Sequence, residues 1–387
     1  MRKFLFIFCV LLAAVSAEAA NLQTKLDKMA ASYHGKVALY AKNLTTAETV
    51  AIDPETPVQT ASVIKLPLML QAFEQVKAGK LSLSQPVVLT KDNQVIGSGV
   101  LQFLDPGLKL TLKDTITMMM ILSDNTATNM VIDTVGLKPT NEMLAQMGMK
   151  NTYFYKKVFK PTTEQMPPDQ KKFGLGKTTA EEMAKVLESI YRCDMGDRAL
   201  CLQMITIMRN QQYQGMIPRY LQRKDSTENL SAIADKVGEL DDVRNDVALV
   251  YTTRGPVIIS IFTYDNRDQS WTFENKAEMF IGRAAEAIVN EWAPGGLAPK
   301  VTDPIAPLST RYPRLTLKAK YAGTVELVAI IKPDGRPTDI TILKGLGNGL
   351  DEKAIEAVRT WHFTPVIGPN GERATVRQII EVTFNLN

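Results

Sequence analysis

The amino-acid sequence predicts a two-domain α+β protein, in which an antiparallel sheet with an inserted helical subdomain is followed by a smaller α+β domain. Two observations support this fold class. Strand patterns lie near both ends of residues 20–292 and helical patterns lie between them, as expected when the two ends of a domain build its sheet. Residues 293–308 then lose all periodicity and are rich in Pro and Gly, which is typical of a linker before a second domain at 309–387.

The elements of the first domain follow from apolar periodicity and turn residues. Two β-rich runs flank Arg254-Gly255-Pro256 and predict a hairpin. A threonine cap and two glutamates predict the start of a helix near residue 179. The expected strands are 37–41, 50–52, 247–253 and 257–263, and the expected helices are 63–77, 112–122, 125–134, 141–147, 179–191 and 275–292.

The second domain shows the same kinds of signal on a smaller scale. Pro333-Asp334-Gly335-Arg336 reads as a turn between two strands. The expected elements are strands at 323–331 and 338–343, a helix at 350–360 and a last strand at 376–384.

The first residues are typical of an export signal. Arg2 and Lys3 supply the positive end, residues 4–15 form an apolar core, and small residues follow up to Ala19. We therefore expect cleavage of residues 1–19. The alternative is an uncleaved membrane anchor, but this apolar run is short for a bilayer, and no other window is long and apolar enough to span one.

Composition excludes several function classes. The net charge is only +4, from 45 basic and 41 acidic residues, and no basic run suggests nucleic acid. His34 and His362 are the only histidines, so a Ser-His-Asp triad or a His-rich zinc site is hard to build. We predict no metal and no cofactor. An activated serine in this chain needs a different base, and a lysine can serve.

The cysteines suggest a structural disulfide. Cys9 lies in the predicted signal, which leaves Cys193 and Cys201, eight residues apart. In an exported chain such a pair favours a disulfide, and two buried free thiols are the alternative.

Three short fragments carry the chemistry. Ser62 and Lys65 are one helical turn apart, Ser123-Asp124-Asn125 follows downstream, and Lys236-Val237-Gly238 comes last. In this order they resemble the S-x-x-K, S-D-N and K-T-G set of class A beta-lactamases and penicillin-binding proteins. The resemblance covers residues 35–292 and implies a beta-lactamase/transpeptidase-like fold. Val237 departs from it, because Thr or Ser is usual there.

The resemblance implies a role for each of these residues. Ser62 would be the nucleophile, Lys65 would take its proton, and Ser123 would relay that proton to the leaving nitrogen. Asn125 would bind a substrate amide, while Lys236 would add positive charge beside Ser123. Metals and cofactors play no part in this scheme.

The strand after Lys236 would bind the substrate. Val237 and Gly238 would form an edge strand, and the backbone N–H groups of Ser62 and Glu239 would form an oxyanion hole. Losing a hydroxyl at Val237 removes one donor to a substrate carboxylate. Arg244 could compensate with a bidentate contact, or it could be an ordinary surface arginine.

Deacylation is the least determined step. Class A beta-lactamases activate the hydrolytic water with the glutamate of an E-x-x-L-N loop pattern, and this pattern is absent here. Glu164 is the only glutamate in the corresponding loop, 151–177. It is a candidate deacylation base, or else a solvated loop residue.

The last 79 residues, 309–387, carry a second resemblance. Gly323-Thr324-Val325, Pro333-Asp334-Gly335 and the segment 361–365, Trp-His-Phe-Thr-Pro, make it similar to the TonB C-terminal domain. This implies a periplasmic or outer-membrane protein partner and a Gram-negative periplasm.

Together these observations predict an exported periplasmic serine hydrolase, with a beta-lactamase as the first hypothesis. A D-Ala-D-Ala peptidase, another amidase or an esterase would use the same site. A beta-lactam or peptidoglycan sensor without turnover, tethered through residues 309–387, is the hypothesis from another class.

Overall fold

We analysed a computed structural model of the chain. It describes residues 21–162, 165–221, 231–298, 314–319, 322–347, 349–361, 363, 366–367 and 373–386. The predicted signal segment 1–19, the candidate Glu164, His362 and residues 299–308 of the predicted linker lie outside the described residues. The chain divides into two compact units between Pro299 and Lys300.

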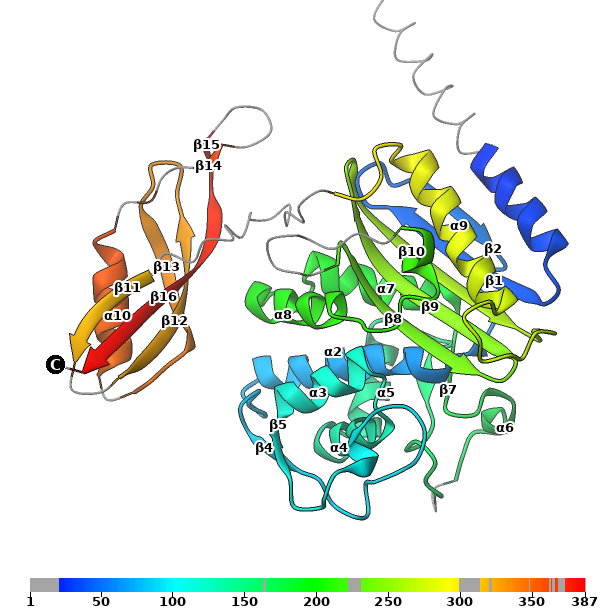
Figure 1. Cartoon of the computed structure of the whole chain (residues 1–387), viewed down its shortest axis with the longest axis horizontal. Coiled ribbons are helices and arrows are strands. Elements are labelled where there is room, and N and C mark those ends of the chain that lie inside the picture. Colours follow the sequence, from blue (N-terminus) through cyan, green and yellow to red (C-terminus); the bar gives the residue numbers. More distant parts are fainter. Residues whose placement is uncertain are drawn as a thin grey trace, which may run out of the picture. The chain divides into compact units, whose positions relative to one another are not determined.

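The first unit contains a five-stranded antiparallel sheet in the order β2-β1-β10-β9-β8 (Figure 1). Its strands come from both ends of the unit, as the sequence predicts, because β1 pairs with β10. The strands are β1 Lys36–Asn43, β2 Thr49–Ile52, β8 Ile233–Leu240, β9 Val243–Thr252 and β10 Gly255–Tyr264. Strand β8 is therefore an edge strand.

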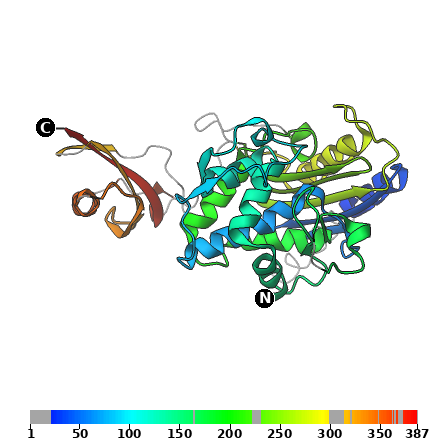
Figure 2. The same ribbon diagram turned by 90° about the horizontal axis from the view of Figure 1, so that it is seen from below.

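Helices cover both faces of this sheet. Helix α9, Lys276–Trp292, and a helix over residues 21–32 lie on one face, while α7, Ala180–Arg192, packs on the other (Figure 1). The helical subdomain lies beyond α7 and is seen from below in Figure 2. Its helices are α2 Lys65–Lys77, α3 Leu112–Ile121, α4 Asn125–Val135 and α5 Leu137–Gln146, and α8 Arg198–Arg209 packs on α3 and β8.

Short elements complete the unit. The strands β3 Val58–Gln59, β7 Gly176–Thr178 and β6 Tyr153–Phe154 form a small sheet, and β4 Pro86–Val88 pairs with β5 Lys109–Thr111. The remaining helical turns are η1 Ala61–Ile64, η2 Leu101–Phe103, α6 Gln170–Phe173 and η3 Ile217–Tyr220.

Three differences from the expected elements have local causes. Helix α5 starts four residues earlier than expected, because Pro139 falls in its first turn, where no backbone donor is required. Helix α8 was not predicted, although its apolar residues have helical spacing. Residues 293–298 belong to the first unit and not to a free linker, because Leu297 is buried and Thr253 donates to the Gly296 carbonyl.

The second unit is a four-stranded sheet with one helix. Its sheet has the order β11-β16-β12-β13, with β11 parallel to β16 and the other pairs antiparallel. Its core is formed by apolar residues of β12, β16 and α10. The elements are β11 Arg314–Ala319, β12 Gly323–Ile331, β13 Pro337–Lys344, α10 Leu350–Arg359, β14 Val366–Ile367, β15 Arg373–Ala374 and β16 Val376–Leu386. Both predicted fold classes are confirmed.

Candidate active site

The Ser62 turn joins the two halves of the first unit. Ser62 lies in the 3-10 turn η1, and Lys65 is the first residue of α2, so the two are one turn apart on a continuous helical path. Ala61, just before Ser62, has a φ of 45°, a left-handed conformation that costs a non-glycine residue roughly 1 kcal/mol. The surrounding packing therefore imposes the orientation of this turn.

Two lysines converge on Ser123. The Lys65 Nζ donates to the Ser123 carbonyl at 2.7 Å, to the Ser123 Oγ at 3.2 Å and to the Asn125 Oδ1 at 3.0 Å. From the opposite side, the Lys236 Nζ donates to the same Ser123 Oγ at 3.1 Å and to the Val237 carbonyl at 2.7 Å. Fragments 58 and 113 residues apart in the sequence thus meet at one hydroxyl.

Burial and mutual repulsion change the acidity of both lysines. Neither Lys65 nor Lys236 has any exposed surface. Burial, aided by the positive charge of Lys236, holds the pKa of Lys65 well below its usual range. Burial also lowers the pKa of Lys236 to about 8, against the opposing effect of nearby carboxylates. A lysine with a lowered pKa can act as a neutral amine, which accepts a proton and then donates it to another group.

Asp124 fixes the segment that carries Ser123 and Asn125. It caps helix α4, where its Oδ1 accepts from the Ala127 N–H at 2.8 Å. Its Oδ2 accepts from the N–H groups of Val100 and Leu101 at 2.7 and 2.9 Å. One buried carboxylate therefore anchors both the helix and the loop that borders the site.

Gly238 lets the edge strand β8 approach the Ser62 turn closely. A Cβ atom on Gly238 would lie 2.6 Å from the Thr60 carbonyl oxygen and 3.0 Å from the Ser62 nitrogen. The neighbouring strand adds a tether, since the Asn245 Nδ2 donates to the Gln59 and Thr60 carbonyls. The predicted oxyanion pair, the N–H groups of Ser62 and Glu239, comes from these two segments.

The opposite face of β8 and β9 holds Arg244. The strand register puts Val237, Glu239 and Arg244 on one face, and Lys236 with Gly238 on the other. The Arg244 guanidinium is 1% exposed and lies 3.7 Å from Glu239 and 3.5 Å from Glu278. The surface reading of Arg244 is therefore wrong, while its predicted contact with a substrate carboxylate stays a prediction.

Two buried carboxyls lie behind Lys236 and were not anticipated from the sequence. Asp235 and Asp246 are both almost fully enclosed, and each has a side-chain oxygen without a hydrogen-bond partner among the described residues. Burial raises the pKa of Asp246 to about 7 and that of Asp235 well above its usual range. For Asp235, the sequence signal was an Asp-Lys pair directly after apolar residues of β8.

The loop beside Asn125 presents apolar groups. The Asn129 side chain clamps the Val158 backbone, donating to its carbonyl at 3.1 Å and accepting from its N–H at 2.9 Å. Phe159 is 67% exposed. A Cβ atom on Gly97 would lie 3.2 Å from a Phe159 ring carbon and 2.6 Å from the Asn125 Nδ2, so both side chains lie against Gly97. Glu164, the predicted base, is outside the described residues, so its predicted role stays a prediction.

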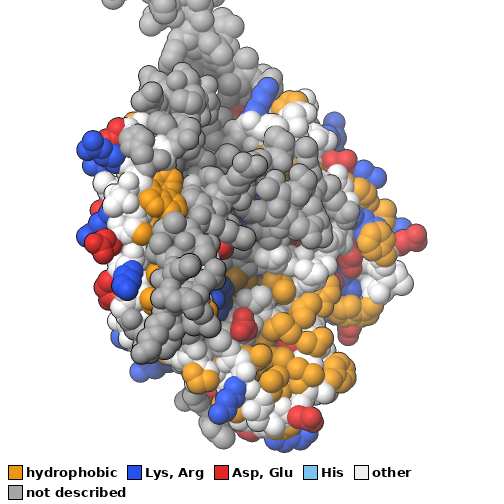
Figure 3. Space-filling view, turned by 60° about the vertical axis from the view of Figure 1, so that its left-hand side comes forward, with side chains coloured by type: hydrophobic (Ala, Val, Ile, Leu, Met, Phe, Trp, Pro, Cys, Tyr) orange, Lys and Arg blue, Asp and Glu red, His pale blue; other side chains and the backbone are white. Residues whose placement is uncertain are grey.

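Apolar side chains are also exposed along the loop that Asp124 anchors. Figure 3 shows hydrophobic side chains gathered in the lower part of the face it presents. The large exposed apolar residues between positions 88 and 108 are Val88, Ile96, Val100, Phe103, Leu104 and Leu108.

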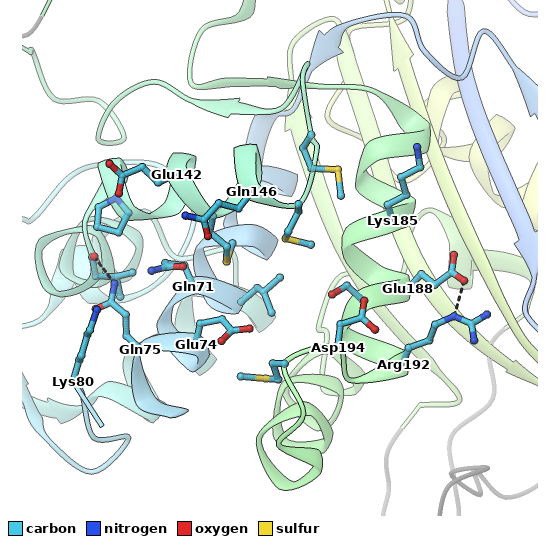
Figure 4. A pocket seen from close by; sticks show the side chains of 18 residues that line it. Gln71, Glu74, Gln75, Lys80, Glu142, Gln146, Lys185, Glu188, Arg192 and Asp194 are labelled. Atoms are coloured by element: carbon cyan, nitrogen blue, oxygen red, sulfur yellow. Dashed lines mark hydrogen bonds and ion pairs between the residues drawn. The ribbon is translucent and has the colours of Figure 1, made fainter. Parts of the chain in front are cut away.

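A large cavity lies away from these residues. It has a volume of about 1060 Å³ and is lined by α2, α5, α7 and the segment after α7 (Figure 4). Glu74 and Gln71 of α2 point toward it from one side, and Glu188 pairs with Arg192 on the other. None of the predicted site residues lines this cavity, so we place the candidate site at Ser62 and not here.

The remaining site features concern covalent links, metals and membranes. The predicted disulfide between Cys193 and Cys201 is present and joins the end of α7 to α8.

Within the described ranges, no group of three or more His, Cys, Asp or Glu side chains could hold a metal ion. A search of the same ranges finds no helix with the length and hydropathy needed to cross a membrane.

Comparisons with known proteins agree with this geometry. A family model described as "Beta-lactamase enzyme family" matches residues 21–292, and one described as "Gram-negative bacterial TonB protein C-terminal" matches residues 309–386. A curated relative, the beta-lactamase regulatory protein BlaB of Streptomyces cacaoi, is 25% identical over 112 residues. That match covers 28% of this chain and only 36% of the relative's length.

Solved structures extend the likeness to the fold. A beta-lactamase from Sphaerobacter thermophilus is 27% identical, with a TM-score of 0.58 over 72% of this chain and 96% of that chain. PBP-A is 21% identical, with a TM-score of 0.59 over 69% and 94% of the two chains. A beta-lactamase from Xanthomonas campestris is 18% identical, with a TM-score of 0.59 over 71% and 98%. At these last two identities only the fold is shared.

Proposed function

This chain belongs to the beta-lactamase enzyme family, and we propose that it is a serine hydrolase whose Ser62 is acylated by its substrate. The observation that supports this proposal is the Ser123 hydroxyl held between Lys65 and Lys236, at 3.2 and 3.1 Å. This arrangement gives a proton acceptor, a relay and a fixed positive charge beside one serine.

The proposed reaction requires Lys65 in its neutral form, in which the Nζ has two N–H groups and gives up one of the three hydrogen bonds described above. Lys65 takes the proton of Ser62 while the Ser62 Oγ forms a bond to the substrate carbonyl carbon. The N–H groups of Ser62 and Glu239 stabilise the resulting oxyanion. The carbon–nitrogen bond then breaks, and the proton passes from Lys65 through Ser123 to the leaving nitrogen. The product is an acyl-enzyme ester on Ser62 and an amine, which is released from an open-chain amide and stays attached to the acyl group when the substrate is a lactam.

We propose beta-lactams as substrates that this site opens, which makes beta-lactamase activity the first hypothesis. Two features support it: the match of the family model and the 27% identity to the Sphaerobacter thermophilus enzyme, which is itself described as a beta-lactamase. Hydrolysis also requires a base for water, and Glu164 remains the proposed residue for that step.

A second candidate is a protein that keeps its acyl group, as a peptidase or a sensor would. The exposed, apolar Phe159 near Asn125 favours this, because an apolar side chain cannot activate a hydrolytic water. The partial match to a regulatory protein, BlaB, points the same way.

Export is part of the proposal. The signal-like residues 1–19 and the disulfide support it, since disulfides persist in oxidising compartments. The TonB C-terminal match supports a Gram-negative periplasm and a protein partner for residues 309–387.

An intact-mass time course with benzylpenicillin tests the proposal, run beside antibiotic consumption and a Ser62→Ala control. We expect an adduct of the penicillin mass on the natural chain and none on the control. An adduct that clears while the antibiotic is consumed supports a beta-lactamase, and one that persists supports the second candidate. If no adduct forms and no antibiotic is consumed, the proposed function fails.

A further inference from the structure

At position 237 the chain lacks the hydroxyl that the family resemblance expects to contact a substrate carboxylate. Beta-lactams and peptides ending in D-Ala carry a carboxylate close to the bond that is cleaved. In this chain Val237 stands where the resemblance expects a hydroxyl, and it is itself buried. None of the residues of β8 from Lys236 to Leu240 has a hydroxyl side chain, so this strand offers only its backbone.

Arg244 lies on the Val237 face, and both of its Nη atoms donate hydrogen bonds, while its Nε lies within 4 Å of two carboxylates without a hydrogen-bond partner among the described residues. Its Nη1 donates to the Leu240 and Val243 carbonyls, and its Nη2 donates to the Ser270 carbonyl at 2.9 Å. The guanidinium carbon also lies 4.4 Å from the centre of the Trp271 ring. A planar group held on its edges and on one face cannot turn toward a substrate without losing these contacts.

Moving the Arg244 guanidinium would also break its ion pairs with two glutamates. Glu239 and Glu278 lie at 3.7 and 3.5 Å from its Nε, and their side chains are only 25% and 12% exposed. Removing one partner of a buried ion pair is strongly unfavourable, because the other charge stays buried and unpaired. Arg219 lies 4.0 Å from Glu278 and could offset only part of that loss.

The charges around this end of the cleft do not favour a further anion. Glu239 follows Gly238 on β8 and shares the Val237 face, so a substrate carboxylate there would face a like charge. Lys236 is cationic, but its Nζ already donates to Ser123 and Val237, and Asp235 and Asp246 act on its charge.

From this arrangement we infer that the natural substrate is an amide or ester whose leaving group is uncharged where family substrates carry a carboxylate. This inference rests on the proposed Ser62 acyl-enzyme and adds a substrate class to it. Neutral esters, carboxamides and amidated peptides belong to that class. There are two structural reasons. Val237 has no hydroxyl to donate to a carboxylate, and the Arg244 guanidinium is bonded to other groups of the protein.

Benzylpenicillin and its methyl ester form a matched pair of probes for this inference. The second-order rate of Ser62 acylation is measured by intact mass for each, and is divided by the rate of its alkaline hydrolysis to remove intrinsic reactivity. A hydrogen bond from the protein to the penicillin carboxylate would make acylation by the acid roughly tenfold or more faster than acylation by the ester. We expect the normalised acid-to-ester ratio to stay below about ten, and a higher ratio would overturn the inference.

A substitution at Val237 tests the effect of the missing hydroxyl separately from that of Arg244. Val237→Thr restores the hydroxyl with little change of shape, and we expect it to raise the acid-to-ester ratio about tenfold. Val237→Ala, which trims the side chain without adding a donor, should leave the ratio unchanged. If Val237→Thr leaves the ratio where it was, the missing hydroxyl is not the cause and the inference fails.

A third variant checks Arg244 directly. Arg244→Lys removes the planar fork, and the ratio of two rates in one protein cancels any loss of folded molecules. We expect no change in the ratio, and a fall would show that the guanidinium does reach the carboxylate. Failure of both probes to acylate Ser62 would instead reject the proposed function, which distinguishes the two outcomes.

Discussion

At the scale of single residues, the chemistry depends on how two lysines share one serine hydroxyl. Lys65 and Lys236 both donate to the Ser123 Oγ, and each is fully buried. Two ammonium groups in one dry site repel each other, so the more strongly shifted one is the better proton acceptor. This asymmetry assigns the base role to Lys65 and the fixed charge to Lys236.

The rate of Ser62 acylation should depend on pH in a bell shape. Lys65 is active as the free amine, so the rate should rise with pH as this lysine loses its proton, at a pH well below the usual lysine pKa. Lys236 is active as a cation, so the rate should fall as pH passes its pKa of about 8. Stopped-time mass measurements between acid and alkaline pH check this, and a rate that keeps climbing through the alkaline range would contradict it.

Gly238→Ala should impair the site more than the fold. The new Cβ would meet the Thr60 carbonyl oxygen at 2.6 Å and push β8 away from the Ser62 turn. A shift of this kind can lower a rate about 100-fold. Gly79→Ala is the matched control: it has open space but a φ of 69°, so it should cost stability without changing acylation of the folded protein. Equal acylation rates in both variants would refute the expectation.

At the scale of elements, the edge strand and the capped helices position the site. Strand β8 lies at the edge of the sheet, because β9 is its only neighbour among the strands that the structure describes. Helix α4 begins at Asn125 and is capped by Asp124, while helix α2 begins at Lys65 without a side-chain cap. The disulfide acts further away, between α7 and α8, where it limits how these helices separate.

Reduction of the disulfide should lower the stability of the first unit without abolishing acylation. The bond between Cys193 and Cys201 closes a short loop, for which chain entropy predicts about 2–3 kcal/mol. Urea unfolding of the natural chain with and without dithiothreitol measures this difference. A Cys193→Ala/Cys201→Ala variant provides the control, because the reductant should leave its midpoint unchanged. An unaltered midpoint for the reduced natural chain would contradict the prediction.

The elements of the fold were predictable where the signal is local. The hairpin at Arg254 and the Thr179 cap of α7 could each be read from short segments, because caps and turns act over a few residues. The edge position of β8 followed from the family resemblance. The start of α5 and the end of the first unit could not be read in this way. Pro139 looks like a breaker in sequence, but it falls in the first turn of α5, where it is tolerated. For the residues after Trp292, only their hydrogen bonds to Tyr251 and Thr253 show that the first unit continues.

At the scale of the whole molecule, two units are carried on one chain. Each has its own sheet and its own buried apolar core, and the second matches a family that the first does not. Domains with separate cores are expected to fold and act independently. The domain boundaries at 292 and 309 remain predictions, with the first unit continuing at least to residue 298.

A chain truncated after residue 299 should keep its chemistry. Every residue that we place at the Ser62 site lies in the first unit, so acylation by benzylpenicillin should stay within about twofold of the full-length rate. Parallel intact-mass time courses of the two proteins make the comparison. Loss of acylation in a truncated protein with an unchanged circular dichroism spectrum would show that the second unit contributes to the site.

The sequence by itself predicted the fold class and identified Ser62, Lys65, Ser123 and Lys236 as candidate site residues, because short motifs and local periodicity carry both signals. The tertiary structure alone decided what surrounds them. Arg244 is buried between Glu239 and Glu278, which lie on different elements. The Asn129 side chain likewise binds the Val158 backbone of a distant loop. Which face of a strand meets which helix depends on register and packing, and no local pattern fixes either.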